Sequence, residues 1–390
     1  MKILVSGASI AGPAVAYWLQ RYGFDVTVVE RGAQLRGGGY PIDIRGVAVE
    51  VVRRMGIHEE LRRAHIDTRA FTFVEPDGRP IATLRPHLPA DDEARSGDLE
   101  VPRGDLARVL YDATKERVTY RFSDSIVGLD DRSDGVDVRF RSGSMQRFDL
   151  VIAADGVHSS TRAIRFGPEE PLHRYLGYCF AGFALRNDFG LSHEAVIWSE
   201  IGRAAALYAV GDRRELHGFL NLSLAVPPFG AFRDPQAQRD LVARAFAHDG
   251  WYVPQMVEAM QSAGDLFFDM VTQIRMPGWS AGRLALVGDA AFAPSFLTGQ
   301  GSSTALVGAY LLAGELATTG DYATAFDRYE KLARPFVEAN QDLVTVGDAT
   351  MFPSTPEALE RRNRILRQLP ALPSDNEPAH WAIDLPDYTG

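Results

Sequence analysis

Cysteine is nearly absent from the chain, which has one such residue, Cys179, among its 390. A single thiol excludes an intramolecular disulfide and a cysteine-rich metal site, and it suits a protein kept in a reducing compartment. We therefore expect a cytoplasmic protein with no metal centre. Cys179, next to Phe180, is interpreted as a small buried apolar side chain.

The chain also has fewer positively charged residues than negatively charged ones. The 41 Lys and Arg residues are outnumbered by 51 Asp and Glu residues, which gives a formal net charge of −10. Nucleic acids and anionic membrane surfaces both attract basic proteins. The composition therefore argues against both as partners, and it leaves the oligomeric state open.

Long apolar runs are missing as well. No stretch reaches the roughly 18 uninterrupted apolar residues that a membrane-spanning helix requires. The apolar N-terminus is interrupted by Gly7, Gly12 and Pro13. Because these residues suit a strand, a turn and a helix better than a secretory signal, we expect neither a signal nor a membrane span.

The chain does have the pattern of an α/β protein. Residues 2–6, 11–22 and 25–30 indicate a strand, a helix and a second strand, and a further helix is expected at 47–55. Residues 71–84 suggest a hairpin around Pro76-Asp77-Gly78. Further strands are expected at 118–122, 125–130, 135–140, 147–153 and 284–287, and helices at 104–117, 235–263, 300–317 and 321–351.

A second sheet is expected at 175–224. This segment is rich in strand-forming and aromatic residues, but it lacks the alternation of strands and helices that parallel sheets require. We therefore predict a mostly antiparallel sheet inserted into the first domain. The residues from 369 onward are rich in proline and acidic groups and suggest an extended tail.

The first residues carry a dinucleotide-binding fingerprint. Gly7 permits a tight turn, Gly12 lets the helix approach the sheet, and Ser9 replaces the middle glycine of G-x-G-x-x-G with a small side chain. The backbone N–H groups at the start of the helix would bind a pyrophosphate. Glu30 lies 18 residues after Gly12, where a carboxylate accepts hydrogen bonds from ribose hydroxyls. Arg31 could cover the adenine, and Glu30 would repel the 2′-phosphate of NADP.

Two further motifs lie downstream. Asp155 opens a D-G-x-x-S-x-x-R pattern between a strand and a helix, and Asp289 follows another buried strand in G-D-A-A. Gly299 and Gly301 lead into a helix whose dipole would stabilise negative charge on a reduced flavin. A chain that carries both the N-terminal fingerprint and the downstream G-D-A-A motif is typical of a protein that binds FAD across its sheet.

These three motifs, in this order, resemble those of the para-hydroxybenzoate-hydroxylase-like FAD-dependent monooxygenases. The length of the chain is similar to that of the tetracycline-inactivating branch. The resemblance implies FAD as cofactor, NADPH or NADH as co-substrate, and insertion of one atom of O2 into an aromatic or polycyclic small molecule. In this family the oxygen passes through a C4a-hydroperoxyflavin.

The resemblance also implies an α/β fold. It has a Rossmann-like FAD-binding domain of the glutathione-reductase type, an inserted, mostly antiparallel β-sheet domain for the substrate, and a long C-terminal helix. The expected limits are 1–70, 98–172 and 278–350 for the FAD-binding domain, 71–97 and 173–277 for the substrate domain, and 351–390 for a C-terminal helix and Pro-rich tail.

The motifs and the resemblance together give the candidate cofactor-binding residues. They are Gly7, Ser9, Ile10, Ala11, Gly12, Glu30, Arg31, Gly38, Asp43, Arg45, Arg103, Val127, Asp155, Gly288, Asp289, Gly299, Gly301 and Ser302. No catalytic residue of the protein is required if the substrate is already electron-rich, because the flavin carries the chemistry. Arg45, Tyr208 and His217 are candidates for that role, and Arg203 and Asn221 are further candidates for substrate contact.

The chain departs from the family pattern after the third motif. Phe292 stands where the family has histidine, and Ser295 and Phe296 stand where it often has two prolines. Ser303 replaces a common asparagine. Because those prolines shape the side of the flavin that faces the substrate, the departures bear on oxygen activation.

Three other functions remain open at this stage. A flavin-dependent oxidase or dehydrogenase could use the same fold, and so could a non-catalytic flavin-binding or ligand-binding protein. A flavin halogenase is disfavoured, because the chain lacks a W-x-W-x-I-P segment. Among the aromatic residues of the second sheet, Trp198 and Phe219 are candidates to line an aromatic pocket.

Overall fold

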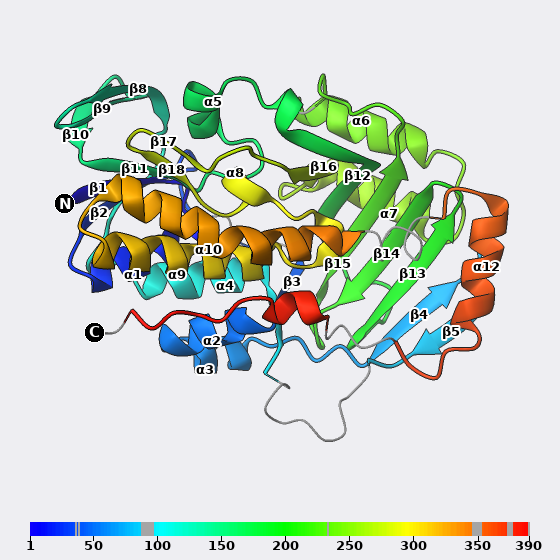
Figure 1. Cartoon of the computed structure of the whole chain (residues 1–390). Helices are drawn as coiled ribbons and strands as arrows, with labels where there is room; N and C mark the ends of the chain where they lie inside the picture. Colours follow the sequence, from blue (N-terminus) through cyan, green and yellow to red (C-terminus); the bar gives the residue numbers. More distant parts are fainter. Residues whose placement is uncertain are drawn as a thin grey trace.

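The structure is a computed structural model that describes residues 1–35, 37, 40–86, 97–231, 234–344, 353–372 and 377–388. Gly38, one of the candidate cofactor contacts, lies outside the described residues. Two large sheets and the helices that cover them make up most of the described chain (Figure 1).

A six-stranded sheet carries the N-terminal fingerprint. Its strands lie in the order β17-β18-β11-β1-β2-β7, and every neighbouring pair is parallel except β17 and β18. The central strands are apolar because helices and a small antiparallel sheet over residues 126–148 pack against this sheet and bury it. The bounds are β1 Lys2–Ser6, β2 Asp25–Val29, β7 Thr119–Arg121, β11 Leu150–Ala153, β17 Ser280–Ala281 and β18 Leu284–Leu286.

Helices from distant parts of the sequence pack around this sheet. Helix α9 is buried along most of its length, since α1, α2 and α10 all contact it. Pro335 lies inside α10, as the sequence suggested. Figure 1 shows α9 and α10 running side by side. The bounds are α1 Ala11–Arg21, α2 Val47–Arg54, α3 His58–Arg63, α4 Arg103–Asp112, α5 Ser160–Phe166, α8 Asp289–Phe292, α9 Gly301–Thr318 and α10 Tyr322–Asp342.

A seven-stranded sheet forms the other large layer. Its order is β16-β12-β15-β14-β13-β4-β5, and all pairs are antiparallel except β13 with β4. Its outer face packs against α6 and α7. The bounds are β4 Ala70–Val74, β5 Pro80–Leu84, β12 His173–Arg186, β13 Glu194–Glu200, β14 Arg203–Ala209, β15 Glu215–Ser223, β16 Phe267–Ile274, α6 Pro235–Ala245 and α7 Val253–Ser262.

The single strand expected at 147–153 is wrong, because the segment contributes to two sheets. Strand β10 (Met145–Phe148) is mostly exposed, with Phe148 alone buried, and pairs with β9 (Gly135–Phe140), which pairs with β8 (Ile126–Arg132). The next strand, β11, is buried throughout and belongs to the parallel sheet. Asp149 separates them, and its carboxylate accepts a hydrogen bond of 2.6 Å from the backbone N–H of Lys2.

Shorter elements complete the described chain. Strands β3 (Pro41–Ile44) and β6 (Leu99–Pro102) form an antiparallel pair in which Asp43 lies opposite Glu100. The short 3-10 turns are η1 Glu170–Leu172, η2 Phe296–Thr298 and η3 Pro378–Trp381.

The C-terminal residues lie against the helices that cover the six-stranded sheet. Helix α12 (Pro356–Leu366) packs beside β5, and the chain then crosses back past α10 and α2 (Figure 1). The Tyr388 hydroxyl donates a hydrogen bond of 2.7 Å to Glu315 on α9. The tail expected to be extended from 369 onward is without helix or strand over 382–388, but it forms the 3-10 turn η3 before that, and it is packed against the protein.

The α/β content predicted from the sequence is confirmed, and the division into domains stays a prediction. Among the described residues, no helix combines the length and apolar character needed to span a bilayer.

Candidate active site

A cavity of about 1740 Å³ is lined by residues from both large sheets. This volume exceeds the roughly 300–1,000 Å³ of a pocket for one drug-sized ligand. It is therefore large enough for a dinucleotide and a second small molecule. The candidate residues that line it are Gly7, Ser9, Ile10, Ala11, Glu30, Arg31, Asp43, Arg45, Arg103, Asp155, Asp289, Gly299, Gly301 and Ser302.

The fingerprint forms one end of the cavity. Gly7 has a φ of 104°, a conformation that favours glycine. A Cβ atom at Gly12 would lie 1.8 Å from the carbonyl oxygen of Gly7, so only glycine lets α1 start this close to β1. The residue before α1, Ile10, provides no side-chain cap. The first N–H groups of the helix are therefore suited to bind a phosphate.

Glu30 is held in place at the end of β2. Its two carboxylate oxygens accept hydrogen bonds from the backbone N–H groups of Ala8 (2.9 Å) and Gly32 (2.8 Å). A carboxylate has lone pairs beyond these two bonds, so Glu30 can still accept from a ribose hydroxyl. The contact of Glu30 with a ribose stays a prediction.

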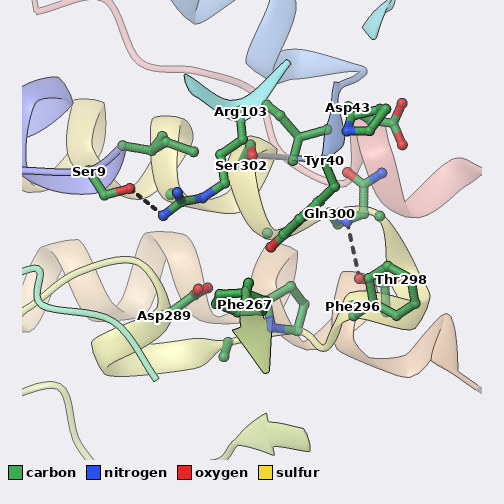
Figure 2. A pocket seen from close by; sticks show the side chains of 18 of the residues that line it. Ser9, Tyr40, Asp43, Arg103, Phe267, Asp289, Phe296, Thr298, Gln300 and Ser302 are labelled. Atoms are coloured by element: carbon green, nitrogen blue, oxygen red, sulfur yellow. Dashed lines mark hydrogen bonds between the residues drawn. The ribbon is translucent and has the colours of Figure 1, made fainter. Parts of the chain in front are cut away.

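Arg103 and Asp289 project into the middle of the cavity from different elements (Figure 2). The Arg103 guanidinium donates a hydrogen bond of 2.6 Å to the Ser9 hydroxyl, and the Arg103 N–H donates to the Tyr40 carbonyl at 3.1 Å. Burial raises the pKa of Asp289 to about 6, and the positive charge of Arg103 opposes that rise. This pair offers a cation for phosphate or ribose oxygens and an acceptor for hydroxyl groups.

The start of α9 closes the next part of the wall. Gly299 has a φ of 66°, and the Gln300 N–H donates a hydrogen bond of 3.1 Å to the Thr298 hydroxyl (Figure 2). Gln300 is 1% exposed, yet its Oε1 finds no hydrogen-bond partner among the described residues. A buried acceptor of this kind is costly unless a bound group donates to it. The wall therefore suits the polar edge of a flavin ring.

Asp155 lines the cavity but is already engaged locally. Its carboxylate accepts hydrogen bonds from the N–H of Thr161 at 3.0 Å and from the hydroxyls of Thr161 and Ser159. Arg162, which is fully buried, donates to the carbonyls of Val157 and Ala290 at 2.7 and 2.9 Å. The hydrogen bond to Ala290 thus joins the D-G-x-x-S-x-x-R motif to the G-D-A-A motif in the folded chain.

Five candidates, including Tyr208, are not among the described residues that line this cavity. Val127 is 44% exposed on β8 and is not among the described lining residues. His217 instead lines a second cavity of about 480 Å³. Gly12 and Gly288 act through packing, since a Cβ at Gly288 would lie 2.7 Å from that of Ala11. Their effect on a cofactor would be indirect.

Arg203, Trp198 and Phe219 are further candidates on the second sheet, and they have different surroundings. Arg203 forms an ion pair with Asp249 at 2.7 Å, and Trp198 is 1% exposed in the core of the outer face. The suggestion that Trp198 lines the pocket is therefore wrong, because its position on β13 faces α6 and α7. Phe219 lines the second cavity and contacts the aromatic cluster beside the first.

That aromatic cluster also lines the main cavity. The Phe180 ring stacks on Phe296 with centroids 4.5 Å apart, and the Tyr40 ring contacts Phe180 at 5.5 Å and Phe267 at 5.7 Å. Figure 2 shows Tyr40 projecting into the space between Ser302 and Phe267. Flat apolar walls of this kind suit an aromatic ligand.

The four residues that depart from the family pattern have different surroundings in the structure. Phe292 is buried against Trp279 at 4.6 Å, Phe296 belongs to the aromatic wall, and Ser295 adopts a φ of 90°. The Ser303 hydroxyl accepts a hydrogen bond of 3.1 Å from the backbone N–H of Arg45. Two of the four substitutions, Ser295 and Phe296, therefore line the cavity directly.

A polar group that the sequence did not single out lies near the aromatic wall. Glu100 lines the cavity and accepts a hydrogen bond of 2.6 Å from the Tyr208 hydroxyl. Burial raises the pKa of Glu100 to about 7, the negative charge of Asp43 adds to the rise, and the Tyr208 hydrogen bond opposes it. A carboxylate inside the otherwise apolar strand β6 is the signal that could have indicated this residue.

Comparison with known proteins identifies the family. Residues 1–170 match the family model described as an FAD binding domain. A flavin-dependent monooxygenase from an unknown prokaryotic organism is 37% identical over 391 residues, which cover 99% of both chains. The chain belongs to the FAD-dependent monooxygenases. FAD is its cofactor, and the predicted resemblance to the para-hydroxybenzoate-hydroxylase-like family is confirmed.

Two further relatives of this monooxygenase match its full length. A flavin-dependent monooxygenase of Legionella longbeachae is 35% identical over 397 residues, covering 100% of this chain and 98% of the relative. The crystal structure of the tetracycline destructase Tet(51) is 35% identical, covers 99% of each chain and superposes with a TM-score of 0.86. The likeness therefore includes both large sheets and the C-terminal residues.

Proposed function

We propose that this monooxygenase uses NADH or NADPH to hydroxylate an aromatic or polycyclic small molecule. One observation carries the proposal: the cavity is continuous from the dinucleotide fingerprint to an aromatic wall on the second sheet. The similarity to a tetracycline destructase supports a polycyclic substrate. Bound FAD, reduced by the nicotinamide co-substrate, supplies the activation of O2 and the transfer of one oxygen atom.

The residues of this chain would bind and orient FAD. The start of α1 suits the pyrophosphate, Glu30 a ribose, Asp289 the ribityl hydroxyls, and the uncapped start of α9 the flavin ring. The dipole of α9 favours negative charge on that ring. Asp43 and Arg45, an ion pair of 3.1 Å, would lie near the ring, as the family resemblance implies.

The aromatic wall would hold the substrate and exclude water. Phe180, Phe267 and Phe296 present apolar surface, and Phe296 is still 38% exposed. That exposed surface would become buried when a flat ligand stacks on it. An apolar enclosure limits loss of the activated oxygen to water. The C4a-hydroperoxyflavin of the family stays a prediction for this chain.

Purified protein tests the proposal. It is expected to be yellow, and its oxidation of NADH or NADPH should accelerate when a polycyclic phenol such as tetracycline is added. The accelerated reaction should consume O2 and yield a hydroxylated product, detected by mass spectrometry. A protein that oxidises neither nicotinamide with any polycyclic phenol would contradict the proposal.

An oxidase that uses the same cofactor is the alternative that the substitution of Ser295 and Phe296 raises. The two activities differ in the fate of O2. An oxidase would yield hydrogen peroxide in an amount equal to the substrate consumed, whereas a monooxygenase would yield far less peroxide than hydroxylated product. The named relatives favour the monooxygenase.

A further inference from the structure

Glu100 occupies a position that neither the cofactor motifs nor the aromatic wall explains. It comes from β6, opposite Asp43 on β3, and its side chain reaches across to β14 of the other sheet. Its backbone is fixed on both sides: the N–H donates to Nδ1 of His65 at 3.1 Å, and the carbonyl accepts from the N–H of Ile66 at 2.8 Å. A carboxyl group is thus held rigidly at the wall of the cavity.

The two carboxyl oxygens of Glu100 have different surroundings. Oε1 accepts the hydrogen bond of 2.6 Å from Tyr208, which is 8% exposed and stands behind Glu100. Oε2 lies 3.5 Å from the hydroxyl of Thr68, and Thr68 in turn contacts the Tyr208 hydroxyl. Because Oε1 already accepts the shorter bond, from a residue that is not among the described lining residues, Oε2 is the oxygen better placed to meet a ligand.

The charges around Glu100 are mixed. Asp43 raises its pKa, Arg45 lowers it, and hydrogen bonds from Tyr208 and Thr68 also lower it, yet burial dominates and the pKa lies at about 7. Burial lowers the pKa of His65, so this neighbour is neutral near pH 7. Asp67 and Arg69, which pair with each other on the same loop, also line the cavity.

We propose that Glu100 is the proton acceptor of the substrate site, and that the site selects a molecule with an ionisable phenol or enol hydroxyl. The inference deepens the proposed function and rests on it, because the same cavity is involved. Glu100 would contact the substrate and is therefore a catalytic residue. Tyr208 and Thr68 are positioning residues that fix the orientation of its carboxyl group.

The proton step balances without any further reactant. The O–H bond of the substrate breaks, an O–H bond forms at Oε2 of Glu100, and the negative charge moves from the carboxylate to the substrate oxygen. No atom is oxidised or reduced in this step. The phenolate is more electron-rich than the phenol, so its ring carbons accept an electrophilic oxygen more readily. A base whose pKa lies near the working pH suits such a transfer.

Infrared difference spectroscopy of the oxidised holoenzyme tests the carboxyl group without turnover. In the wild type, the C=O absorption of protonated carboxyl groups should fall as the pH rises from 6 to 8, and Asp289, with a pKa of about 6, should contribute part of that fall. The component with a midpoint near pH 7 should be missing from Glu100→Gln and retained in Glu116→Gln, a matched change at an exposed site. Tyr208→Phe should shift the midpoint to higher pH, because it removes a donor that stabilises the carboxylate. A component with a midpoint near pH 7 that persists in Glu100→Gln would overturn the assignment.

Ligand binding to the oxidised holoenzyme tests the substrate class. We choose 2-naphthol, a polycyclic phenol whose single hydroxyl is protonated at pH 8, and its methyl ether, which lacks that hydroxyl, and measure both dissociation constants at pH 8 by calorimetry. The wild type should prefer 2-naphthol by at least about tenfold, because a hydrogen bond to a charged group contributes roughly 1.5–3 kcal/mol. Glu100→Gln should reduce that preference about tenfold, and Glu116→Gln should leave it unchanged. Equal affinities in the wild type, or no binding of either probe, would overturn the selectivity.

These results separate the inference from the proposed function. If Glu100→Gln hydroxylates a polycyclic phenol with an unchanged pH profile of kcat, the inference fails and the proposed function stands. If the wild type shows the pH-dependent band and the phenol preference but hydroxylates nothing, the proposed function fails instead.

Discussion

The guanidinium of Arg103 donates a hydrogen bond of 2.6 Å to the hydroxyl of Ser9, a residue 94 positions earlier in the chain. This bond joins the first residue of α4 to the turn that precedes α1, so a phosphate bound at that turn would meet a positive charge. The site is thus assembled from segments that are distant in sequence but fixed relative to one another.

Replacement of Arg103 should weaken FAD binding more than replacement of Ser9. Arg103→Met removes a charged donor, and a hydrogen bond of that type is worth roughly 1.5–3 kcal/mol, which corresponds to about 10- to 150-fold in Kd. Ser9→Ala removes one neutral partner and should cost less than tenfold. Flavin fluorescence on dilution of the holoenzyme measures both. Equal affinities for wild type and Arg103→Met would contradict the assignment.

Asp289 should destabilise the flavin-free protein at neutral pH. Burial raises its pKa to about 6 from an ordinary value near 3.8, so the unfolded chain releases the proton first and stability falls as the pH rises from 4 to 6. Asp289→Asn should therefore stabilise the flavin-free protein at pH 7 by up to about 3 kcal/mol. It should also weaken FAD binding, because the amide is a poorer acceptor. Urea unfolding at pH 4 and pH 7 checks the first effect, and an unchanged or lower stability at pH 7 would refute it.

His158 should make the free energy of unfolding depend on pH in the alkaline range. Its two ring nitrogens lie 3.0 Å from Glu169 and 3.1 Å from Asp269. Burial lowers the pKa of His158, but the hydrogen bonds to both carboxylates outweigh burial and raise the pKa to about 9. The stabilisation, roughly 2 to 3 kcal/mol, should be complete below pH 6.5 and lost as the pH rises through 9.

Urea unfolding at pH 6 and pH 9.5 measures this effect. His158→Gln should unfold at nearly the same urea concentration at both pH values, after correction for the shared background. His248→Gln, a matched change at an exposed histidine, should behave as the wild type does. A wild-type pH dependence that survives in His158→Gln would assign the effect to another group.

The C-terminal residues should contribute to stability through Tyr388. Its ring fills the space above Gly314, where a Cβ atom would lie 2.1 Å from the ring, and its hydroxyl donates to Glu315. Tyr388→Ala should cost roughly 3–5 kcal/mol, as removal of a buried aromatic ring does. Tyr388→Phe should cost about 1 kcal/mol, and Gly314→Ala should destabilise by displacing the ring. If the urea midpoint of Tyr388→Ala equals that of the wild type, the tail does not stabilise the fold.

The sequence was sufficient to predict the positions of residues whose conformation depends on their neighbours in the chain. Gly7, Gly12 and Glu30 belong to one continuous unit of strand, turn, helix and strand, so their positions follow from local geometry. The start of α9 at Gly301 follows from the preceding glycines in the same way. Gly7, Glu30 and Gly301 line the cavity, and their contact with the cofactor stays a prediction.

Residues that depend on tertiary pairing were harder to predict. The alternation of apolar and polar residues did not reveal that Val127 lies on a small separate sheet, nor that the chain changes sheets at Asp149. Glu100, Thr68 and Tyr208 come from three segments that meet only when β6 approaches β14. No local pattern links them, so sequence reasoning found Tyr208 alone.

Turnover under ¹⁸O2 tests the central claim most directly. The enzyme, NADH or NADPH and a polycyclic phenol that accelerates nicotinamide oxidation are combined, and the product is analysed by mass spectrometry. The account predicts a product that carries one ¹⁸O atom from O2 and little hydrogen peroxide. An unlabelled product, formed with an equal amount of labelled hydrogen peroxide, would contradict it.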